Sequence, residues 1–324
     1  MSNAIVLREY GGPEALRLEP TEVGAPGPEE LRIRHTAIGV NFHDAYVRSG
    51  LYRTLKLPGI PGVEAAGIVE EAGRNALGFV PGDRIAYVTG QYGAYSQERV
   101  LPASVALKLP DGVSDEVAAS ITVKGLTACM LLKRVRPVHA GDTVLIHAAA
   151  GGVGQMLVRW AKHLGATVIG TAGSAEKARI ARECGADHVI LYREENFLDR
   201  VQALTQGKGV GVVYDSVGQD TFSRSIDCLA YFGTAVSFGQ SSGAIEPFSI
   251  SRLAVRSTSV ARPILFHYLQ ERPALEAMAR ETFGALAAGI LRARTVLRLP
   301  LSEAAEAHRA IESRALSGAI ILIP

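Results

Sequence analysis

The sequence predicts an α/β protein in which a doubly wound parallel sheet is inserted into a mostly β domain. Three features of the 324-residue chain lead to this prediction. The first third is broken into short apolar strands by Gly- and Pro-rich turns. The segment from Gly141 to Phe238 alternates strand with helix. The tail after Arg262-Pro263 is too small for a domain of its own.

Short apolar stretches between closely spaced turns predict the mostly β part. Turn signals such as Gly11-Gly12-Pro13 and Pro81-Gly82-Asp83 separate these stretches. Such spacing is typical of a compact, barrel-like domain. The predicted strands are Ala4–Leu7, Glu30–His35, Gly67–Glu71 and Asp83–Val88.

A helix over Asp115–Leu132, capped by Ser114, precedes the alternating segment. Strict alternation predicts a parallel sheet that helices cover on both faces. The predicted strands are Thr143–His147, Thr167–Thr171, His188–Tyr192, Gly211–Asp215 and Thr234–Phe238. The predicted helices are Val153–Leu164, Ala175–Cys184, Phe197–Thr205 and Thr221–Leu229.

The C-terminal tail is predicted to return to the first domain. It carries helical patterns over Ala274–Ala288 and Ser302–Ser313 and an apolar strand over Gly318–Ile323. We therefore expect one domain made of residues 1–123 plus 263–324. The inserted domain spans residues 124–262.

Composition excludes several classes of function. The chain is 48% hydrophobic and 20% charged, and its net charge of +2 favours neither nucleic acid nor an acidic membrane. No apolar run is long enough to span a bilayer, and MSNAIVLREYGG does not resemble a signal peptide, so a cytoplasmic location is expected. Cys129, Cys184 and Cys228 are too scattered for a structural metal site or a disulfide framework.

A glycine turn follows the first predicted strand of the inserted domain. Ala149, Gly151 and Gly154 fill the three positions of a dinucleotide-binding fingerprint. A diphosphate would lie at the helix N-terminus, on the backbone of residues Ala150, Gly151, Gly152 and Val153. The alternative is a turn that binds nothing. The strand before it, the helix after it and the further strand–helix units favour nucleotide binding.

The end of the next strand indicates which nucleotide is bound. A protein that binds NAD places Asp or Glu here to hold the ribose hydroxyls, whereas this chain has Ala172-Gly173-Ser174. Small residues leave room for a 2′-phosphate, and Lys177 supplies a countercharge. Tyr192, at the end of the third strand, should lie beside the same pocket. The predicted cofactor is therefore NADPH, the alternative being that Lys177 is a solvated helix lysine.

Motifs along the whole chain carry a family resemblance. They are NFHDAYVRSGLY, PGVEAAGIV, GAYSQ, KGLTA, HAAAGGVGQ, VVYDSVG and VSFGQSSG. With them the chain resembles the zinc-free, zeta-crystallin-like NADPH:quinone oxidoreductases of the medium-chain dehydrogenase/reductase superfamily. The resemblance implies a Rossmann-type sheet inserted into a GroES-like domain. It also implies quinone reduction by hydride from the nicotinamide.

Comparison with the zinc-dependent members of that superfamily predicts no metal site. Those relatives place Cys and His where this chain has Asn41 and Val63, and neither side chain replaces a zinc ligand. Glu64 remains, but a single carboxylate does not hold a catalytic zinc. His43 and Asp44 are expected in an extended stretch, on opposite faces. Without a Lewis acid the enzyme needs an acceptor that takes hydride readily, such as a quinone or an activated alkene.

The resemblance also implies the residues around the nicotinamide. They are Asn41, Thr127, Phe238, Gly239, Ser241, Arg262 and Arg314, with Ser216 and Val217 one strand earlier. Tyr46 and Tyr52 are predicted to face the substrate, although each can equally be a packing residue. Solvent can protonate a reduced quinone. Tyr52 is the best candidate for a proton donor, if there is one.

Two other functions and one partner remain open. The chain can instead reduce α,β-unsaturated carbonyls, because both acceptors are conjugated systems. It can also be a structural or RNA-binding NADPH protein, although the low net charge disfavours RNA. Members of the family are commonly homodimers, and Ala244–Val260 is predicted to provide an edge strand for such pairing.

Overall fold

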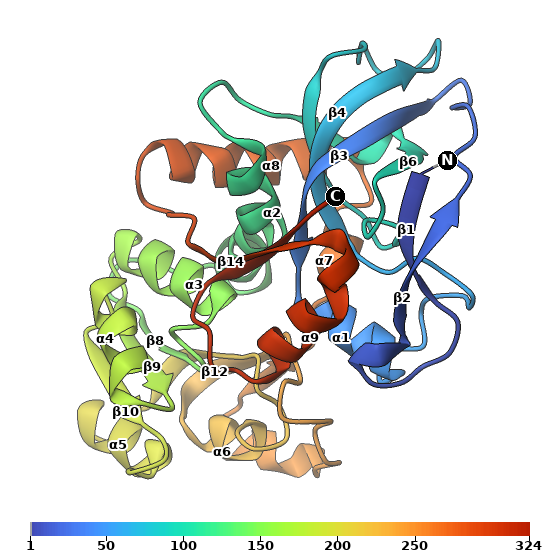
Figure 1. The fold of residues 1–324 in the computed structure, drawn as a ribbon. Coiled ribbons are helices and arrows are strands. Elements are labelled where there is room, and N and C mark those ends of the chain that lie inside the picture. Colours follow the sequence, from blue (N-terminus) through green and yellow to red (C-terminus); the bar gives the residue numbers. More distant parts are fainter. Residues whose placement is uncertain (1) are drawn as a thin grey trace. The chain divides into compact units, whose positions relative to one another are not determined.

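The computed structural model describes residues 2–324 and divides into two compact units. Unit 1 contains the described residues up to Val123, together with Leu269–Phe283 and Ala293–Pro324. Unit 2 contains Lys124–Tyr268 and Gly284–Arg292. The first and last strands of the chain both belong to unit 1 (Figure 1).

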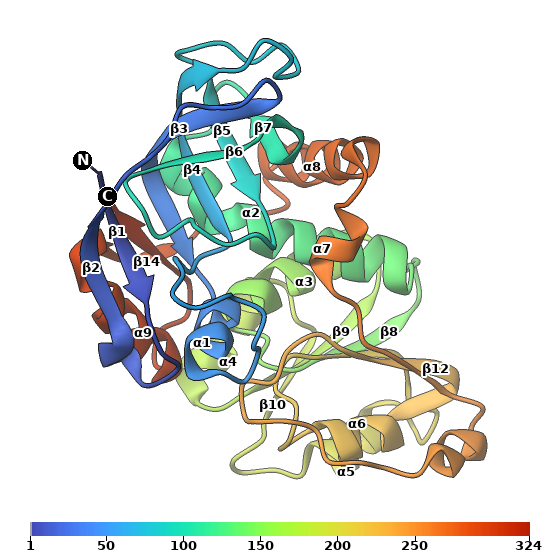
Figure 2. The same ribbon diagram turned by 90° about the vertical axis from the view of Figure 1, so that its right-hand side faces the viewer.

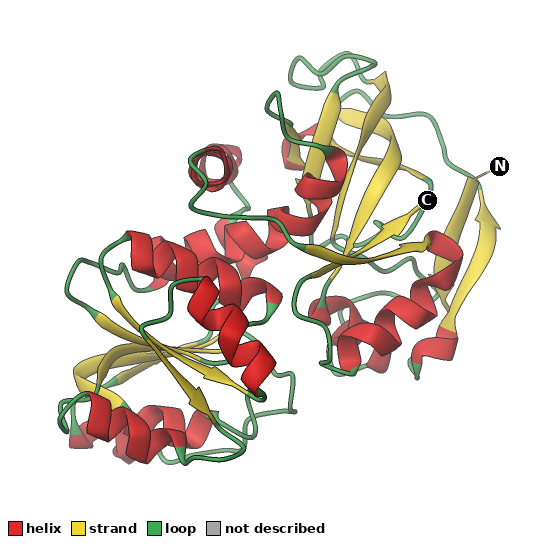
Figure 3. Ribbon diagram, turned by 60° about the vertical axis from the view of Figure 1, so that its left-hand side comes forward, coloured by secondary structure: helices red, strands yellow, loops and turns green. Residues whose placement is uncertain are grey.

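Unit 2 is built on a parallel sheet with helices on both faces (Figure 3). Its strand order is β10-β9-β8-β11-β12-β13, and all neighbouring pairs are parallel. The order reverses beside β8, which is the doubly wound arrangement that the sequence predicts. The strands are β8 (Thr143–Ile146), β9 (Thr167–Ala172), β10 (His188–Leu191), β11 (Val210–Asp215), β12 (Leu229–Ser237) and β13 (Ser259–Ala261).

The predicted helices of this unit are confirmed to within a few residues. Helix α2 begins after Ser114, whose hydroxyl accepts a hydrogen bond from Val117 N at 3.3 Å. The boundary between the units falls inside this helix. The elements are α2 (Asp115–Met130), a π-helical turn (Leu131–Val135), α3 (Gly152–His163), α4 (Ala175–Glu183), α5 (Phe197–Leu204), α6 (Phe222–Asp227), η4 (Ile250–Val255) and α7 (Leu265–Tyr268).

Unit 1 is mostly β, as predicted. Its larger sheet has the order β14-β15-β3-β4-β5-β7, with β6 also paired to β3, and β1 pairs with β2 (Figure 2). The strands are β1 (Ser2–Leu7), β2 (Leu16–Thr21), β3 (Glu30–Val40), β4 (Glu64–Ala72), β5 (Arg84–Val88), β6 (Glu98–Pro102), β7 (Ala106–Lys108), β14 (Thr295–Pro300) and β15 (Ala319–Ile323). The helical elements are η1 (Pro13–Ala15), α1 (Phe42–Ser49), η2 (Ala103–Val105), η5 (Leu301–Glu303) and α9 (Ala304–Glu312). Helix α8 (Arg272–Ala287) belongs to unit 1 as far as Phe283, and its last residues belong to unit 2.

Two local predictions are wrong. His43 and Asp44 lie in helix α1, because Asn41 and Asp44 form a capping box that starts a helix directly after β3. Residues 244–260 do not form one edge strand, because a 3₁₀ helix interrupts the segment and only its end belongs to β13 (Ser259–Ala261).

Each unit has its own apolar core. In unit 2, Leu145, Ile169 and Val213 lie on neighbouring parallel strands and are at most 1% exposed. In unit 1, the buried alanines of β3, β4 and β5 pack with Ala118 and Ala119 of α2. Small side chains let the helix lie close against this sheet. Among the described residues, no helix is both long and apolar enough to cross a membrane.

Candidate functional site

The glycine turn joins β8 to α3 in unit 2. Gly151 is the N-cap of α3, and the helix begins at Gly152. A Cβ atom at Gly154 would collide with the Ala148 carbonyl oxygen, so close packing of turn and helix requires glycine there. At Gly151 the nearest atom to an added Cβ would be Ala148 O, at 3.1 Å. A Cβ atom would thus be tightly placed at Gly151 as well. A helix N-terminus leaves its first backbone N–H groups without a partner inside the helix, which is the arrangement that binds a diphosphate.

Lys124 is a residue at this turn that the sequence reasoning missed. A Cβ atom at Gly152 would lie 3.1 Å from Lys124 Cδ, so the lysine chain crosses the start of α3. Lys124 is only 6% exposed. The positive end of a helix dipole disfavours a nearby cation, and a bound anion offsets that repulsion. Sequence reasoning could have found Lys124 because it is the first residue of KGLTA, one of the motifs that carry the family resemblance.

The structure brings Gly173, Ser174, Lys177 and Tyr192 together at the ends of β9 and β10. Ser174 is the N-cap of α4, and its Oγ accepts from Lys177 N at 3.3 Å. A Cβ atom at Gly173 would lie 2.6 Å from the Tyr192 hydroxyl oxygen. No carboxylate occurs between Ala172 and Ala175. The Ser174 hydroxyl and the Tyr192 phenol thus lie where the second strand ends, and the Lys177 backbone N–H is bonded to that hydroxyl.

The loops after β11 and β12 lie against each other. Ser241 N donates to Ser216 O at 3.1 Å, and Phe238 N donates to Asp215 O at 2.9 Å. A Cβ atom at Gly239 would lie 2.8 Å from Ser216 O, so this contact needs glycine. The predicted cofactor residues Ser216, Val217, Phe238, Gly239 and Ser241 therefore form one connected surface.

A buried polar network supports the loop after β11. Asp215 Oδ1 accepts from the backbone N–H groups of Val217 at 2.8 Å and Gly218 at 3.0 Å. Its Oδ2 accepts from the Ser225 hydroxyl at 3.0 Å. His147 is 1% exposed and joins the network through Ser225 Oγ, 3.0 Å from its Nε2. Burial lowers the pKa of His147, an effect that the nearby Asp215 carboxylate opposes.

Two other residues predicted at the nicotinamide, Arg262 and Thr127, belong to unit 2. Arg262 is exposed and donates to Ser237 O at 3.1 Å, beside the end of β12. Thr127 lies within α2 and is 9% exposed. Arg314 belongs instead to unit 1, where it is exposed and follows α9 with a positive φ of 55°.

In unit 1, Asn41 lies between two buried carboxylates. Its backbone N–H donates to Asp44 Oδ2 at 2.8 Å, and its Nδ2 donates to Glu64 Oε1 at 2.8 Å. Asp44 and Glu64 are each fully buried, and Asn41 is 8% exposed. The amide nitrogen is therefore held by the Glu64 carboxylate, and Asn41 is almost completely buried.

Tyr46 and Tyr52 belong to an aromatic cluster of unit 1. Their ring centroids are 5.1 Å apart in an edge-to-face arrangement. His43 contacts Tyr52 at 5.7 Å and stacks on Tyr92 at 5.9 Å. Burial among these rings lowers the pKa of His43 to about 4, so its imidazole is neutral at pH 7. Sequence reasoning missed His43 and Tyr92, because nothing in their spacing along the chain indicates a contact.

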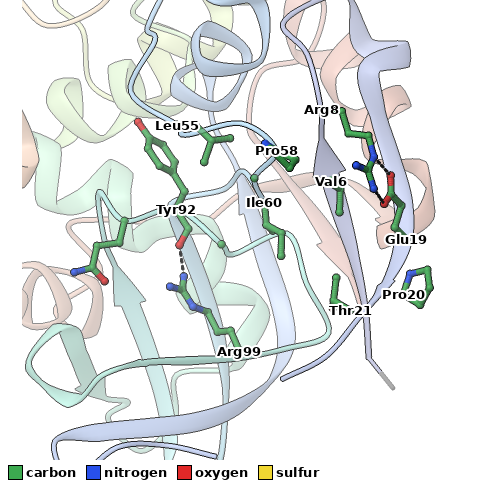
Figure 4. Close-up of a pocket in the computed structure, with 13 residues that line it drawn as sticks. Val6, Arg8, Glu19, Pro20, Thr21, Leu55, Pro58, Ile60, Tyr92 and Arg99 are labelled. Carbon is green, nitrogen blue, oxygen red and sulfur yellow. Dashed lines mark hydrogen bonds and ion pairs between the residues drawn. The ribbon is translucent and has the colours of Figure 1, made fainter. Parts of the chain in front are cut away.

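Unit 1 also has an open groove that contains none of the predicted residues (Figure 4). Its charged groups have partners: Arg8 Nη2 lies 2.7 Å from Glu19 Oε2, and Arg99 donates to the carbonyl oxygen of Tyr92. Within residues 2–324, no three His, Cys, Asp or Glu side chains are grouped as a metal site would need.

Comparison with known proteins places the chain in a family. Residues 27–111 match the model of the alcohol dehydrogenase GroES-like domain, and residues 152–280 match that of the zinc-binding dehydrogenases. A quinone oxidoreductase of Pseudomonas aeruginosa is 45% identical, with both chains covered completely. The chain belongs to the quinone oxidoreductases of the medium-chain dehydrogenase/reductase superfamily. It is therefore an oxidoreductase.

Two further proteins are similar to this chain, one found by sequence and one by structure. A 2-haloacrylate reductase of Burkholderia is 43% identical over all of this chain and 99% of the relative. The crystal structure of Escherichia coli quinone oxidoreductase complexed with NADPH has a TM-score of 0.96 and 42% identity, covering 99% of this chain and 100% of that one. The predicted fold class, a Rossmann-type sheet inserted into a GroES-like domain, is confirmed.

The His147 network predicts how the stability of unit 2 depends on pH. The folded state lowers the pKa of His147. The contribution of His147 to the free energy of unfolding is therefore fully present above the ordinary histidine pKa of about 6.5. That contribution is lost as the pH falls below this value, since only the unfolded chain takes up the proton. The free energy of unfolding should therefore decrease by up to ~1.4 kcal/mol per pH unit on account of this residue.

Urea unfolding at pH values of about 7.5 and 5.5 measures this slope. Trp160, the one tryptophan of the chain, is 2% exposed in α3 and reports on unit 2. We expect a smaller slope for His147→Gln than for the wild type. His163→Gln, a change at an exposed position of helix α3, should keep the wild-type slope. If the free energy of unfolding had the same pH slope in the wild type and in His147→Gln, the role assigned to His147 would be contradicted.

Proposed function

We propose that this chain is an NADPH-dependent quinone reductase that transfers hydride directly, without a metal ion. The observation that carries the proposal is the site after β9, where Ser174, Lys177 and Tyr192 lie together with no carboxylate among them. NADPH, when bound, supplies a hydride from C4 of its nicotinamide ring. The protein residues bind and orient the two reactants and exclude water.

The adenosine end of the cofactor fits two neighbouring parts of unit 2. The diphosphate is assigned to the N-terminus of α3, on the backbone of Ala150, Gly151, Gly152 and Val153. Lys124 adds a positive charge at the same helix end. The 2′-phosphate is assigned to Ser174, Lys177 and Tyr192, with Gly173 leaving the space. A carboxylate at residues 172–174 would repel that group.

The nicotinamide end is assigned to the loops after β11 and β12. Asp215 holds the turn that carries Ser216 and Val217 in one fixed conformation. The loop after β12 adds further polar groups. The residues proposed for this end are Ser216, Val217, Phe238, Gly239, Ser241, Arg262 and Thr127, together with Asn41 and Arg314 of unit 1.

The acceptor is assigned to Asn41, Tyr46 and Tyr52. The two phenols offer aromatic surface and hydroxyl groups, and the Asn41 amide can hydrogen-bond an acceptor oxygen. Asn41 and Val63 stand where zinc-dependent relatives have Cys and His, and neither is a zinc ligand by type. The acceptor must therefore take hydride without help from a Lewis acid, which a quinone does.

One observation favours activated alkenes as a second class of acceptor. The Burkholderia relative, 43% identical, is named for the reduction of a 2-haloacrylate, which contains a conjugated double bond. The same hydride donor and the same aromatic surface suit either acceptor.

We further propose that the protein acts in the cytoplasm as a homodimer. Strand β13 is the edge of the parallel sheet, and Phe232, Ile250 and Val255 expose 77 to 78% of their surface in the same unit. Apolar exposure beside the open edge of a sheet is typical of an interface. Sedimentation equilibrium should give twice the chain mass of 34.4 kDa. The chain mass itself would contradict the dimer.

Lys177→Ala should weaken NADPH binding by roughly 10- to 100-fold and leave NADH binding almost unchanged. A hydrogen bond to a charged group contributes ~1.5–3 kcal/mol, and NADH lacks the 2′-phosphate. Fluorescence titration with each nucleotide measures the two dissociation constants.

Arg179→Ala is the matched control, since Arg179 lies two residues along the same helix and pairs with Glu183. It should bind both nucleotides as the wild type does. An equal loss of NADPH and NADH affinity in Lys177→Ala would refute the assignment of the 2′-phosphate.

Stopped-flow oxidation of NADPH should be faster with 1,4-benzoquinone than with a 2-alkenal. For the quinone, Tyr52→Phe should leave kcat within about twofold, because a hydroquinone anion needs no enzyme acid. Tyr52→Ala should raise the quinone KM, because it removes the ring that contacts Tyr46 and His43. A large fall in kcat for Tyr52→Phe would instead identify the Tyr52 hydroxyl as a proton donor.

A further inference from the structure

Glu64 is a buried carboxylate that connects two separate segments of unit 1. It is fully buried at the start of β4. Its Oε1 accepts from Asn41 Nδ2 at 2.8 Å, and its Oε2 accepts from the Val123 backbone N–H at 2.7 Å. Each oxygen thus has its own donor, and charge-assisted bonds of this kind hold a side chain in one position.

The surrounding chain makes room for this carboxylate. A Cβ atom at Gly39, on β3, would collide with both Glu64 Oε1 and the carbonyl oxygen of Ala119. Any larger residue at position 39 would displace either the carboxylate or helix α2. Strand β3, the start of α1, strand β4 and helix α2 therefore converge on one acidic group.

The chemistry of Glu64 determines how the Asn41 amide is turned. An ionised carboxylate only accepts hydrogen bonds, so the side that faces it must be the amide nitrogen. The opposite rotamer would place two acceptor oxygens against each other. The backbone of Asn41 is fixed independently by Asp44, which accepts its N–H at 2.8 Å. Main chain and side chain are thus each oriented by a different buried carboxylate.

We propose that Glu64 is a positioning residue, which fixes the Asn41 amide and so sets the hydrogen-bond pattern that Asn41 offers to its ligand. This inference rests on the proposed function, in which Asn41 contacts the cofactor and the acceptor. Glu64 itself touches neither. Its effect on catalysis is carried entirely by the orientation of Asn41.

Glu64→Gln tests the proposal with a side chain of the same size. Glutamine has one acceptor oxygen for two donors, so its NH₂ group must face either Asn41 or the Val123 N–H. We expect the NADPH dissociation constant, or kcat/KM for 1,4-benzoquinone, to worsen by about tenfold. In an Asn41→Ala background the same change should alter both quantities by less than about twofold, because the residue it acts through is gone.

Asp115→Asn is the matched control. Asp115 is also a carboxylate of unit 1, at the start of helix α2, and it accepts from Thr36 Oγ1 at 2.7 Å and from Arg84 Nε at 2.9 Å. Its substitution should lower the urea midpoint of unfolding without changing either constant. The proposal would be overturned if Glu64→Gln had the same effect in the wild type and in the Asn41→Ala background. It would also be overturned if Glu64→Gln changed neither the NADPH dissociation constant nor kcat/KM.

The double variant that combines Asn41→Asp with Glu64→Gln covers the case in which Glu64→Gln alone fails to fold. Here the introduced glutamine can donate to the new carboxylate while its oxygen accepts from Val123 N. We expect a higher urea midpoint than for Glu64→Gln, with NADPH binding and turnover still at least about tenfold weaker than in the wild type. Wild-type function in the double variant would overturn the proposal. A wild-type protein that does not bind NADPH would refute the proposed function itself. If the wild type is active but the effects of Glu64→Gln and Asn41→Ala simply add, only the role of Glu64 is refuted.

Discussion

The Asp215 carboxylate fixes the loops that carry most of the proposed cofactor contacts. It ends β11, is fully buried, and accepts from two backbone N–H groups and from the hydroxyls of Thr221 and Ser225. A buried charge is tolerated only when donors surround it. The turn after β11 therefore cannot move without leaving this carboxylate unsatisfied. The loop after β12 is held in place as well, because the backbone N–H groups of Ser241 and Ser242 donate to carbonyl oxygens of this turn.

Unit 1 uses the same physical device with different residues. Glu64 accepts from one side chain and one backbone N–H, and Asp44 accepts from the backbone of Asn41. Residues beyond the end of a strand have no ladder of hydrogen bonds to hold them. In both units a buried carboxylate takes over that task. The residues that face a ligand can then be small or neutral, because their orientation is set from behind.

The sequence predicted the parallel sheet well because its signals are local. Apolar runs such as Val144–Ile146, bounded by glycine turns, define strands without any knowledge of distant residues. Ser114 marked the start of α2 correctly by cap chemistry. Helix α1 was missed, although Asn41 and Asp44 carried the same kind of signal. The family motif around them was interpreted as an extended segment.

The residues that hold the site in place could not be predicted from the sequence in the same way. Glu64 and Val123 are 59 positions apart, and His147 and Ser225 are 78 apart, so only the fold brings them together. Asp215 was treated as the end of a strand, since a carboxylate at a strand end has many possible partners. Sequence patterns and the family resemblance propose the residues that face the ligand, whereas the residues that hold them depend on long-range packing.

The aromatic cluster of unit 1 bears on the choice of acceptor. Tyr46, Tyr52 and Tyr92 contribute aromatic rings, and the low pKa of His43 keeps its ring uncharged at pH 7. An anionic acceptor such as a haloacrylate gains no ion pair from these rings and loses hydration on approaching them. A neutral quinone loses little hydration, and its flat ring can stack on the phenols. In the proposed acceptor site, the electrostatics of the cluster thus favour the quinone over a charged alkene, even though both accept hydride.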